Sequence, residues 1–369
     1  MNHNTQHLHD MGQRIWLDNI TRHLLTSGAL KHYISELSVT GLTSNPTIFE
    51  HAISGSTDYD DAIQKLLTHG LTDEDIFFSL AIEDLTQAAD LFKPTFDASD
   101  GIDGWVSLEV SPLLANDTVN TIKAATTLHQ RAARPNLFIK IPVTPEGIPA
   151  IEQAIFDGIP INVTLLFSRE HYLAAAYAYL RGLERRLAAG LDLRVASVAS
   201  LFVSRWDVAV MDKVSPQYRN RLGIAIAMHT YKAYLDLLNS ERWQKLAQAG
   251  ARPQRLLWAS TGTKDPSASN TMYVEALAAT QTINTIPEKT LLAFADHGKK
   301  DVIALHIDGG NSEALLEVFR REGVDDAALA SKLQQEGVAA FTKSWTELLS
   351  QIRAKSVRGV ERPANITSS

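Results

Sequence analysis

The stretch Leu137-Phe138-Ile139-Lys140-Ile141-Pro142-Val143 has the composition of a buried strand, with a lysine at its centre. Side chains alternate along a strand, so Lys140 points into the fold if Ile139 and Ile141 face outer helices. Burying an unpaired ammonium costs several kcal/mol, so such a lysine needs a carboxylate beside it or a lowered pKa. A neutral buried amine is a nucleophile for carbonyl carbons. A lysine snorkelling from a strand end, or held in a structural ion pair, explains this strand equally well.

The rest of the chain repeats this strand pattern. Short β-branched and apolar runs alternate with amphipathic stretches of helical period, which is typical of a parallel α/β fold. The predicted strands are Ile15–Asp18, Ser38–Thr43, Trp105–Val110, Leu137–Val143, Ile161–Phe167, Val195–Phe202, Leu256–Thr261 and Ile283–Ile286. Eight parallel strands close a (β/α)8 TIM barrel, with Lys140 inside it. The predicted outer helices are Gly147–Asp157, Ser168–Leu187 and Leu222–Leu246.

The chain is expected to form a single domain over residues 11–355. The segment Asp58–Phe92 predicts two or three helices, a helical insertion between the second and third strands. Additional C-terminal helices are expected over Ser312–Glu322 and Asp325–Ile352. Residues 1–10 are polar and are expected to be a disordered N-terminus, and residues 356–369 a flexible tail rich in Pro, Ser, Thr and Asn.

Composition excludes several classes of protein. The 369 residues contain no cysteine, which excludes disulfides, thiolate metal sites and cysteine nucleophiles. The 35 Lys+Arg against 42 Asp+Glu give a formal charge of -7, so no nucleic-acid partner is expected. No apolar run approaches the roughly 18 residues that span a bilayer, and no signal peptide is recognisable at the start. We therefore expect a cytoplasmic protein with no membrane association, and a monomer or homodimer.

Polar side chains recur with the same parity as Lys140 on other predicted strands. The carboxyl ends of barrel strands carry the active site, so these side chains are expected to converge there. They are Asp18 on the first strand, Ser107 and Glu109 on the third, and Asn162 and Thr164 on the fifth. Taken singly, Asp18 also suits the cap of a following helix, and Thr164 a simple β-propensity choice.

Two segments predict a phosphate site. They are Ser200-Leu201-Phe202-Val203-Ser204-Arg205 and Ser260-Thr261-Gly262-Thr263-Lys264, which follow the sixth and seventh predicted strands. Hydroxyl groups, backbone N–H groups and cations are the groups that hold phosphate. Without the other motifs, a turn and an arginine at a helix start explain them as well. No P-loop or dinucleotide-binding pattern occurs.

Six motifs in order resemble the transaldolase family over nearly the whole chain. They are Ile15–Asp18, Gly41–Ile48, Ser107–Ser111, Phe138–Pro142, Ile161–Phe167 and Ser200–Arg205. The resemblance implies a barrel of the class I aldolase type. It also implies that Lys140 forms a Schiff base, that Asp18 is the acid/base at the carbon–carbon bond, and that Glu109 and Thr164 position a catalytic water. The implied substrate-binding residues are Asn45, Asn162, Ser200, Phe202 and Arg205, the last on the phosphate.

One segment departs from the family pattern. In the family that this chain resembles, many members have an Ala-Ser-Phe-Arg run after the seventh strand. This chain has Ala259-Ser260-Thr261-Gly262-Thr263-Lys264 at that place. We expect Ser260 and Lys264 to bind substrate there, with Lys264 supplying a point charge from a shifted register. This segment and the long helical extension look like the larger bacterial branch of the family.

The resemblance implies a transaldolase of the pentose phosphate pathway. Such an enzyme transfers a dihydroxyacetone unit from sedoheptulose 7-phosphate or fructose 6-phosphate to glyceraldehyde 3-phosphate or erythrose 4-phosphate, without cofactor or metal. An alternative is fructose-6-phosphate aldolase, whose similar but shorter barrel typically has glutamine at the position of Glu109 and tyrosine at that of Phe202. A second alternative is a non-catalytic sugar-phosphate binder.

Overall fold

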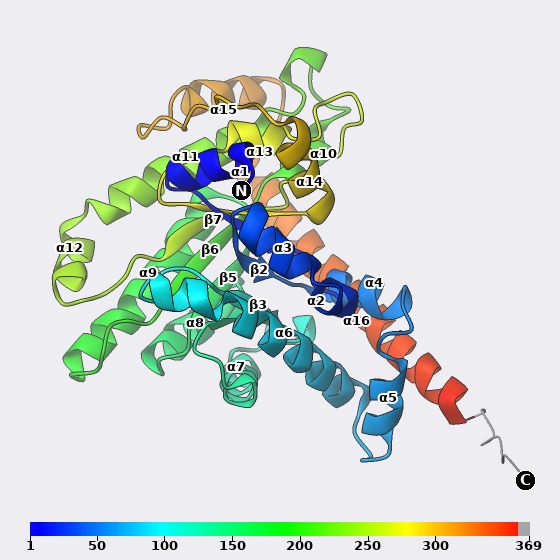
Figure 1. Cartoon of the computed structure of the whole chain (residues 1–369). Coiled ribbons are helices and arrows are strands. Elements are labelled where there is room, and N and C mark those ends of the chain that lie inside the picture. Colours follow the sequence, from blue (N-terminus) through cyan, green and yellow to red (C-terminus); the bar gives the residue numbers. More distant parts are fainter. Residues whose placement is uncertain (361–369) are drawn as a thin grey trace, which may run out of the picture.

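Eight parallel strands form a closed barrel in the computed structural model, which describes residues 1–360 (Figure 1). Each strand pairs with the next, and β8 pairs with β1. The strands are β1 (Arg14–Asp18), β2 (Val39–Thr43), β3 (Val106–Glu109), β4 (Leu137–Pro142), β5 (Ile161–Leu166), β6 (Ser197–Phe202), β7 (Arg255–Ala259) and β8 (Ile283–Ile286). The predicted barrel is confirmed, and the predicted strand ends differ from these by no more than one or two residues.

Helices surround the barrel and extend beyond it. They are α1 (His3–Asp10), α2 (Arg22–Thr26), α3 (Ala29–Glu36), α4 (Pro46–Ser54), α5 (Asp60–Leu67), α6 (Asp73–Ala98), α7 (Thr118–Ala132), α8 (Gly147–Phe156), α9 (Arg169–Ala188), α10 (Ser204–Val210), α11 (Leu222–Leu238), α12 (Glu241–Gln248), α13 (Met272–Ala276), α14 (Glu288–His297), α15 (Ser312–Arg321) and α16 (Asp326–Val360). The 3-10 turns η1 (Pro112–Leu114) and η2 (Pro216–Tyr218) complete the described elements. None of the helices in this part of the chain is both long and apolar enough to cross a membrane.

The expectation of a disordered N-terminus is wrong, because residues 3–10 form helix α1. The Asn2 side chain caps this helix by accepting from the backbone N–H groups of Asn4 and Thr5. The Asn4 amide donates to the carbonyls of Phe294 and Gly298, and Leu8 is fully buried. A polar segment is thus tied down by a cap, two tertiary hydrogen bonds and one apolar anchor.

Two other predicted boundaries need correction. The predicted helix Leu222–Leu246 is two helices, because α11 ends at Leu238 and Ser240 caps α12 by accepting from the Trp243 N–H. The predicted flexible tail begins too early, because α16 continues to Val360 and Ser356 in it is buried. Residues 361–369 of that tail lie outside the described residues.

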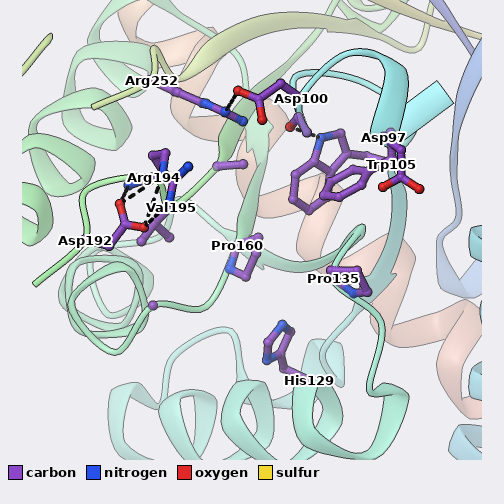
Figure 2. Close-up of a pocket in the computed structure, with 14 residues that line it drawn as sticks. Asp97, Asp100, Trp105, His129, Pro135, Pro160, Asp192, Arg194, Val195 and Arg252 are labelled. Atoms are coloured by element: carbon purple, nitrogen blue, oxygen red, sulfur yellow. Dashed lines mark hydrogen bonds and ion pairs between the residues drawn. The ribbon is translucent and has the colours of Figure 1, made fainter. Parts of the chain in front are cut away.

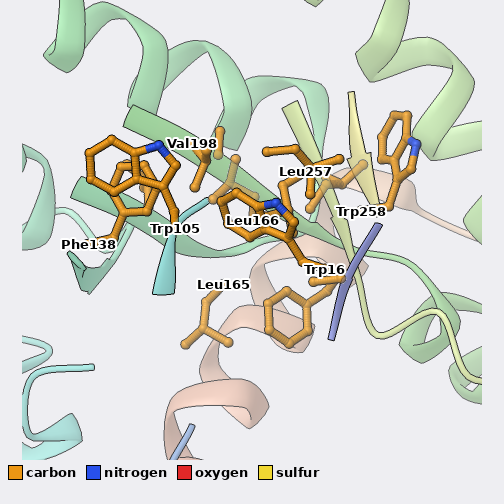
Figure 3. Packing of buried hydrophobic residues seen from close by; sticks show 14 of the residues in the cluster. Trp16, Trp105, Phe138, Leu165, Leu166, Val198, Leu257 and Trp258 are labelled. Atoms are coloured by element: carbon orange, nitrogen blue, oxygen red, sulfur yellow. The ribbon is translucent and has the colours of Figure 1, made fainter. Parts of the chain in front are cut away.

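Tryptophans pack in and around the barrel (Figure 3). The Trp16 indole donates to Asp103 Oδ1 at 2.9 Å, and Trp105 stacks on Phe138 with ring centroids 4.1 Å apart. Gly41 lies beside Trp16 on the neighbouring strand, and a Cβ at Gly41 would come within 2.6 Å of the indole. The absence of a side chain at Gly41 therefore leaves the space that the Trp16 indole fills.

Gly41→Ala is expected to lower the free energy of unfolding by about 1–3 kcal/mol, the usual cost of overpacking a core. The added methyl has to displace Trp16, whose indole is fixed by its hydrogen bond to Asp103. Denaturant unfolding of the two proteins measures the difference. An unchanged unfolding midpoint would show that the indole moves aside at no cost.

The segment between β2 and β3 holds α4, α5 and α6, as expected of a helical insertion. Helix α16 packs along all three and also contacts β5, and Figure 1 shows it running beside α4 and α5. Its Gln334 amide donates to the carbonyls of Val143 and Leu165, which lie at the carboxyl ends of β4 and β5. The C-terminal helix is therefore fastened across the rim of the barrel where an active site is expected.

Candidate active site

A cavity of about 240 Å³ opens at the carboxyl ends of the strands. All the predicted site residues line it except Ser107, Glu109 and Asn162, which are buried in the barrel. The lining residues that the sequence did not single out include Thr43, His51, Thr285 and Phe341. The barrel thus brings together side chains from strands far apart in the sequence.

A second cavity, of about 430 Å³, lies at the opposite end of the barrel (Figure 2). Its lining includes Trp105, Pro135 and Pro160, which come just before β3, β4 and β5. Its two ion pairs join Arg194 to Asp192 and Arg252 to Asp100, so the arginine charges are already matched. Barrel enzymes place their chemistry at the carboxyl ends, which makes the first cavity the candidate active site.

Lys140 lies at the base of the first cavity. Its Nζ is 3.0 Å from Glu109 Oε2 and donates to the Ser44 carbonyl at 3.0 Å. Glu109 and Lys140 are register partners on β3 and β4, and each side chain is only 6% exposed. The predicted inward direction of Lys140 and its partner carboxylate are therefore confirmed. Lys140 also lines the cavity, so this ion-paired lysine borders the space that a ligand would fill.

Asp18 is a carboxylate on the wall of the cavity. Its Oδ1 accepts a hydrogen bond of 2.8 Å from the Thr43 hydroxyl, which in turn contacts the Thr285 hydroxyl. Burial raises the pKa of Asp18, while the Thr43 hydrogen bond and the positive charges of Lys140 and Lys264 act to lower it. Asp18 therefore holds its proton at higher pH than an ordinary aspartate.

Burial also raises the pKa of Glu109, the carboxylate paired with Lys140. The positive charge of Lys140 opposes this rise. A carboxyl with a raised pKa beside an amine is suited to moving protons to and from that amine.

A chain of hydrogen bonds lies beneath the cavity. The Ser200 hydroxyl donates to Asn162 Oδ1 at 2.7 Å, and the Asn162 amide donates to Ser107 Oγ at 3.1 Å. Asn162 is fully buried and belongs to this chain rather than to the cavity wall. Thr164 does line the cavity, and its hydroxyl is buried with no hydrogen-bond partner among the described residues. An unpartnered buried hydroxyl of this kind is suited to holding a water or a substrate group.

Asn45 lies at the start of α4, on the wall of the cavity. Its Oδ1 caps the helix by accepting from the Ile48 N–H at 3.0 Å, and Pro46 follows at the first helical position. With the oxygen engaged, the amide nitrogen is the group that remains for a ligand hydroxyl. The motif that predicted Asn45 as a substrate ligand is also a helix start.

The cations of the predicted phosphate site both line the cavity. Arg205 follows β6 and Lys264 follows β7, as the strand count predicts. Ser260 also lines the cavity, and its hydroxyl contacts the Ser204 hydroxyl at 2.8 Å. The shifted register of Lys264 does not remove it from the cavity. Two cations and a hydroxyl on the wall of one cavity suit an anionic group such as phosphate.

Sequence reasoning missed the residues that complete the wall. Thr43 stands in the quoted motif Gly41–Ile48, but only the barrel shows that its hydroxyl meets Asp18. Thr285 is on the short strand β8, and Phe341 comes from α16, far from every motif. No group of three or more His, Asp or Glu side chains within residues 1–360 is arranged to hold a metal ion.

The fold and the buried lysine together define the class of protein, an aldolase-type (β/α)8 barrel. The family model for transaldolase/fructose-6-phosphate aldolase matches residues 15–352. The transaldolases of Thermobifida fusca and Thiobacillus denitrificans are each 45% identical over 94% of this chain, covering 96% and 99% of their own lengths. That of Saccharopolyspora erythraea is 44% identical over 95% of this chain and 97% of its own. The chain belongs to the transaldolase/fructose-6-phosphate aldolase family.

Proposed function

We propose that the protein is a transaldolase that works through a Schiff base on Lys140. It transfers a dihydroxyacetone unit from sedoheptulose 7-phosphate or fructose 6-phosphate to glyceraldehyde 3-phosphate or erythrose 4-phosphate. The reaction is that of a transferase in the pentose phosphate pathway. The observation that carries the proposed chemistry is the Lys140–Glu109 pair, 3.0 Å apart at the base of a cavity that also contains Asp18.

The donor ketose phosphate lies across the cavity in this proposal. Its phosphate binds Arg205, with Lys264 and Ser260 beside it, and its hydroxyls reach Asn45 and Ser200. Asn162 acts from below through its hydrogen bond with Ser200. This orientation sets the C2 carbonyl against the Lys140 amine at the base.

The first chemical step joins Lys140 to the donor. Lys140 passes a proton to Glu109, and the neutral amine attacks C2 to form a carbinolamine. A water held by Glu109 and the free hydroxyl of Thr164 relays the proton to the departing C2 hydroxyl, which leaves as water. The product is an iminium ion, whose positive nitrogen accepts the electrons of the next step.

The second step breaks the C3–C4 bond. Asp18 takes the C4 hydroxyl proton, the C4–O electrons form the aldehyde of the departing aldose phosphate, and the bond electrons move to the iminium as an enamine. An incoming aldose phosphate is attacked by the enamine carbon, and Asp18 returns its proton to the new hydroxyl. Hydrolysis of the new iminium frees the product and restores Lys140.

Two residues favour transfer over release of free dihydroxyacetone, the outcome of the alternative fructose-6-phosphate aldolase reaction. Phe202 lines the cavity and has no proton to give to the enamine, which therefore survives until an acceptor arrives. A glutamate stands at position 109. A non-catalytic binder would have no use for a buried lysine and two carboxylates with raised pKa values.

Phe202→Tyr is expected to raise the release of free dihydroxyacetone from fructose 6-phosphate in the absence of acceptor. The tyrosine hydroxyl supplies the proton that phenylalanine cannot supply. A coupled dehydrogenase assay measures release, and transfer to glyceraldehyde 3-phosphate is measured in the same preparation as a control for folding. If release does not rise while transfer persists, Phe202 does not protect the enamine.

The pH profile offers a test of the Asp18 environment. Because burial raises the pKa of Asp18, the acidic limb of the kcat/KM profile is expected above the ordinary carboxyl range of about 4. Thr43→Val removes a hydrogen bond to the charged form, so it is expected to move this limb further up. Thr285→Val is the matched control, because the Thr285 hydroxyl contacts Thr43 and not Asp18. Equal shifts in both variants would refute the assignment.

The proposed activity is tested by converting sedoheptulose 7-phosphate and glyceraldehyde 3-phosphate to fructose 6-phosphate and erythrose 4-phosphate without added cofactor. Formation of both products in equal amounts is expected, and free dihydroxyacetone without transfer would favour the lyase. We further propose that the enzyme works in the cytoplasm as a monomer or homodimer, with sugar phosphates and no nucleic acid as partners.

A further inference from the structure

Helix α16 contacts the wall of the candidate active site through residues of one stretch, 334–341. Gln334 donates to the carbonyls of Val143 and Leu165 at 3.2 and 3.1 Å. Leu165 has a φ of 59°, which is unusual for a branched residue, and the pairing of β5 with β6 shifts register there. Gln334 thus supports an irregular rim segment of β5.

Gly337 lies one helical turn further on, against the same rim. A Cβ at this position would come within 2.9 Å of Leu165 Cδ2 and 3.3 Å of Arg205 Nη1. Figure 3 shows Leu165 on the side of the cluster that faces α16. The absence of a side chain at Gly337 therefore lets the Arg205 guanidinium lie directly against the helix.

Phe341, one helical turn beyond Gly337, lies near the same guanidinium. Its ring centroid is 5.9 Å from Arg205 Cζ, and the Phe202 centroid is 5.3 Å from the same atom. Both distances are within cation–π range. Phe341 lines the cavity, as Phe202 and Arg205 do. The two rings therefore lie beside Arg205 on the cavity wall.

The position of α16 is itself fixed. Ser344 contacts the Thr47 hydroxyl at 2.8 Å, close to Asn45 at the start of α4. Further along, Lys355 donates to the Ser56 carbonyl and pairs with Asp60 on the insertion. Contacts of this kind hold the helix in one register over the rim.

We propose that Gly337 and Phe341 are positioning residues that set the Arg205 guanidinium for phosphate, so that α16 forms part of the active site. The inference rests on the proposed role of Arg205 as the phosphate-binding cation. Gly337 leaves the guanidinium its space, and Phe341 and Phe202 hold its plane. A substrate without a phosphate gains nothing from this arrangement.

The test compares Gly337→Ala and Phe341→Leu with the wild-type enzyme. Two readouts report on the phosphate subsite, the KM for fructose 6-phosphate and the inhibition constant of inorganic phosphate as a competitor. Both are expected to rise roughly tenfold together, with kcat within about twofold. Phe319→Leu is the matched control, because Phe319 is buried on α15, packs near Tyr218 and lies outside the cavity. Arg205→Gln gives the full effect of losing the cation.

Thermal unfolding separates positioning from stability. Where nothing obstructs its methyl group, alanine stabilises a helix interior more than glycine does. The proposal is therefore supported if the Gly337→Ala variant unfolds at no lower temperature than the wild type but binds phosphate less tightly. The proposal is overturned if both α16 variants bind phosphate like the wild type, or if Phe319→Leu has the same effect, while Arg205→Gln weakens binding. If Arg205→Gln itself leaves both constants unchanged, the proposed role of Arg205 fails instead.

Discussion

Lys140→Ala is expected to abolish transfer, with kcat falling by at least about 10⁴-fold, the scale of losing a covalent nucleophile. No other amine lies beside Glu109 among the ion pairs of the described residues, so nothing replaces the bond to C2. Lys140→Arg is expected to be equally inactive although it keeps a positive charge beside Glu109. Steady-state transfer assays with highly concentrated enzyme measure the residual rate.

Lys264→Ala is the matched control for this prediction. Lys264 lines the same cavity, and the proposed function gives it a place at the phosphate rather than in the chemistry. Its removal is therefore expected to raise KM and to leave turnover measurable. Turnover that survives in Lys140→Ala and disappears in Lys264→Ala would reverse the two assignments.

Asp18→Asn is expected to slow cleavage of the carbon–carbon bond by about 10²–10⁴-fold, the usual contribution of a general base. The asparagine keeps an oxygen that can accept from Thr43, so the geometry of the hydrogen bond persists without the base. Formation of the Schiff base is expected to continue, because Glu109 and not Asp18 contacts Lys140.

Single-turnover experiments separate the two steps in Asp18→Asn. Trapping with borohydride reports the Schiff base, and the appearance of the aldose phosphate reports cleavage. A trapped fraction near that of the wild type with slow cleavage is the expected pair of results. An equal loss of both would show that Asp18 acts before the bond breaks.

The barrel could be predicted because strand signals are local. Lys140 and its apolar neighbours, and the runs before Asp18 and Thr164, carry the period of two in a few residues each. The N-terminal helix could not, because its stability comes from tertiary contacts of Asn4 and Leu8 rather than from an apolar stripe. The break after Leu238 depends on a cap at Ser240 within an otherwise helical pattern.

The site divides in the same way. Side-chain parity placed Lys140 beside Glu109 because strands β3 and β4 are neighbours in register. Parity could not show that Asn162 lies beneath the cavity wall, or that Thr43 meets Asp18, because both depend on side-chain geometry inside the barrel. Phe341 comes from a helix that follows the whole barrel, so no strand pattern points to it.

The proposed function depends on the covalent bond between substrate and Lys140, and borohydride trapping measures that bond directly. The enzyme is incubated with fructose 6-phosphate and borohydride, digested and mapped by mass spectrometry. We expect one adduct, carried by the peptide that contains Lys140. The proposed function would be contradicted by an adduct on Lys264, which is the other lysine of the cavity wall. It would be contradicted equally by an adduct on any other residue, or by no adduct at all.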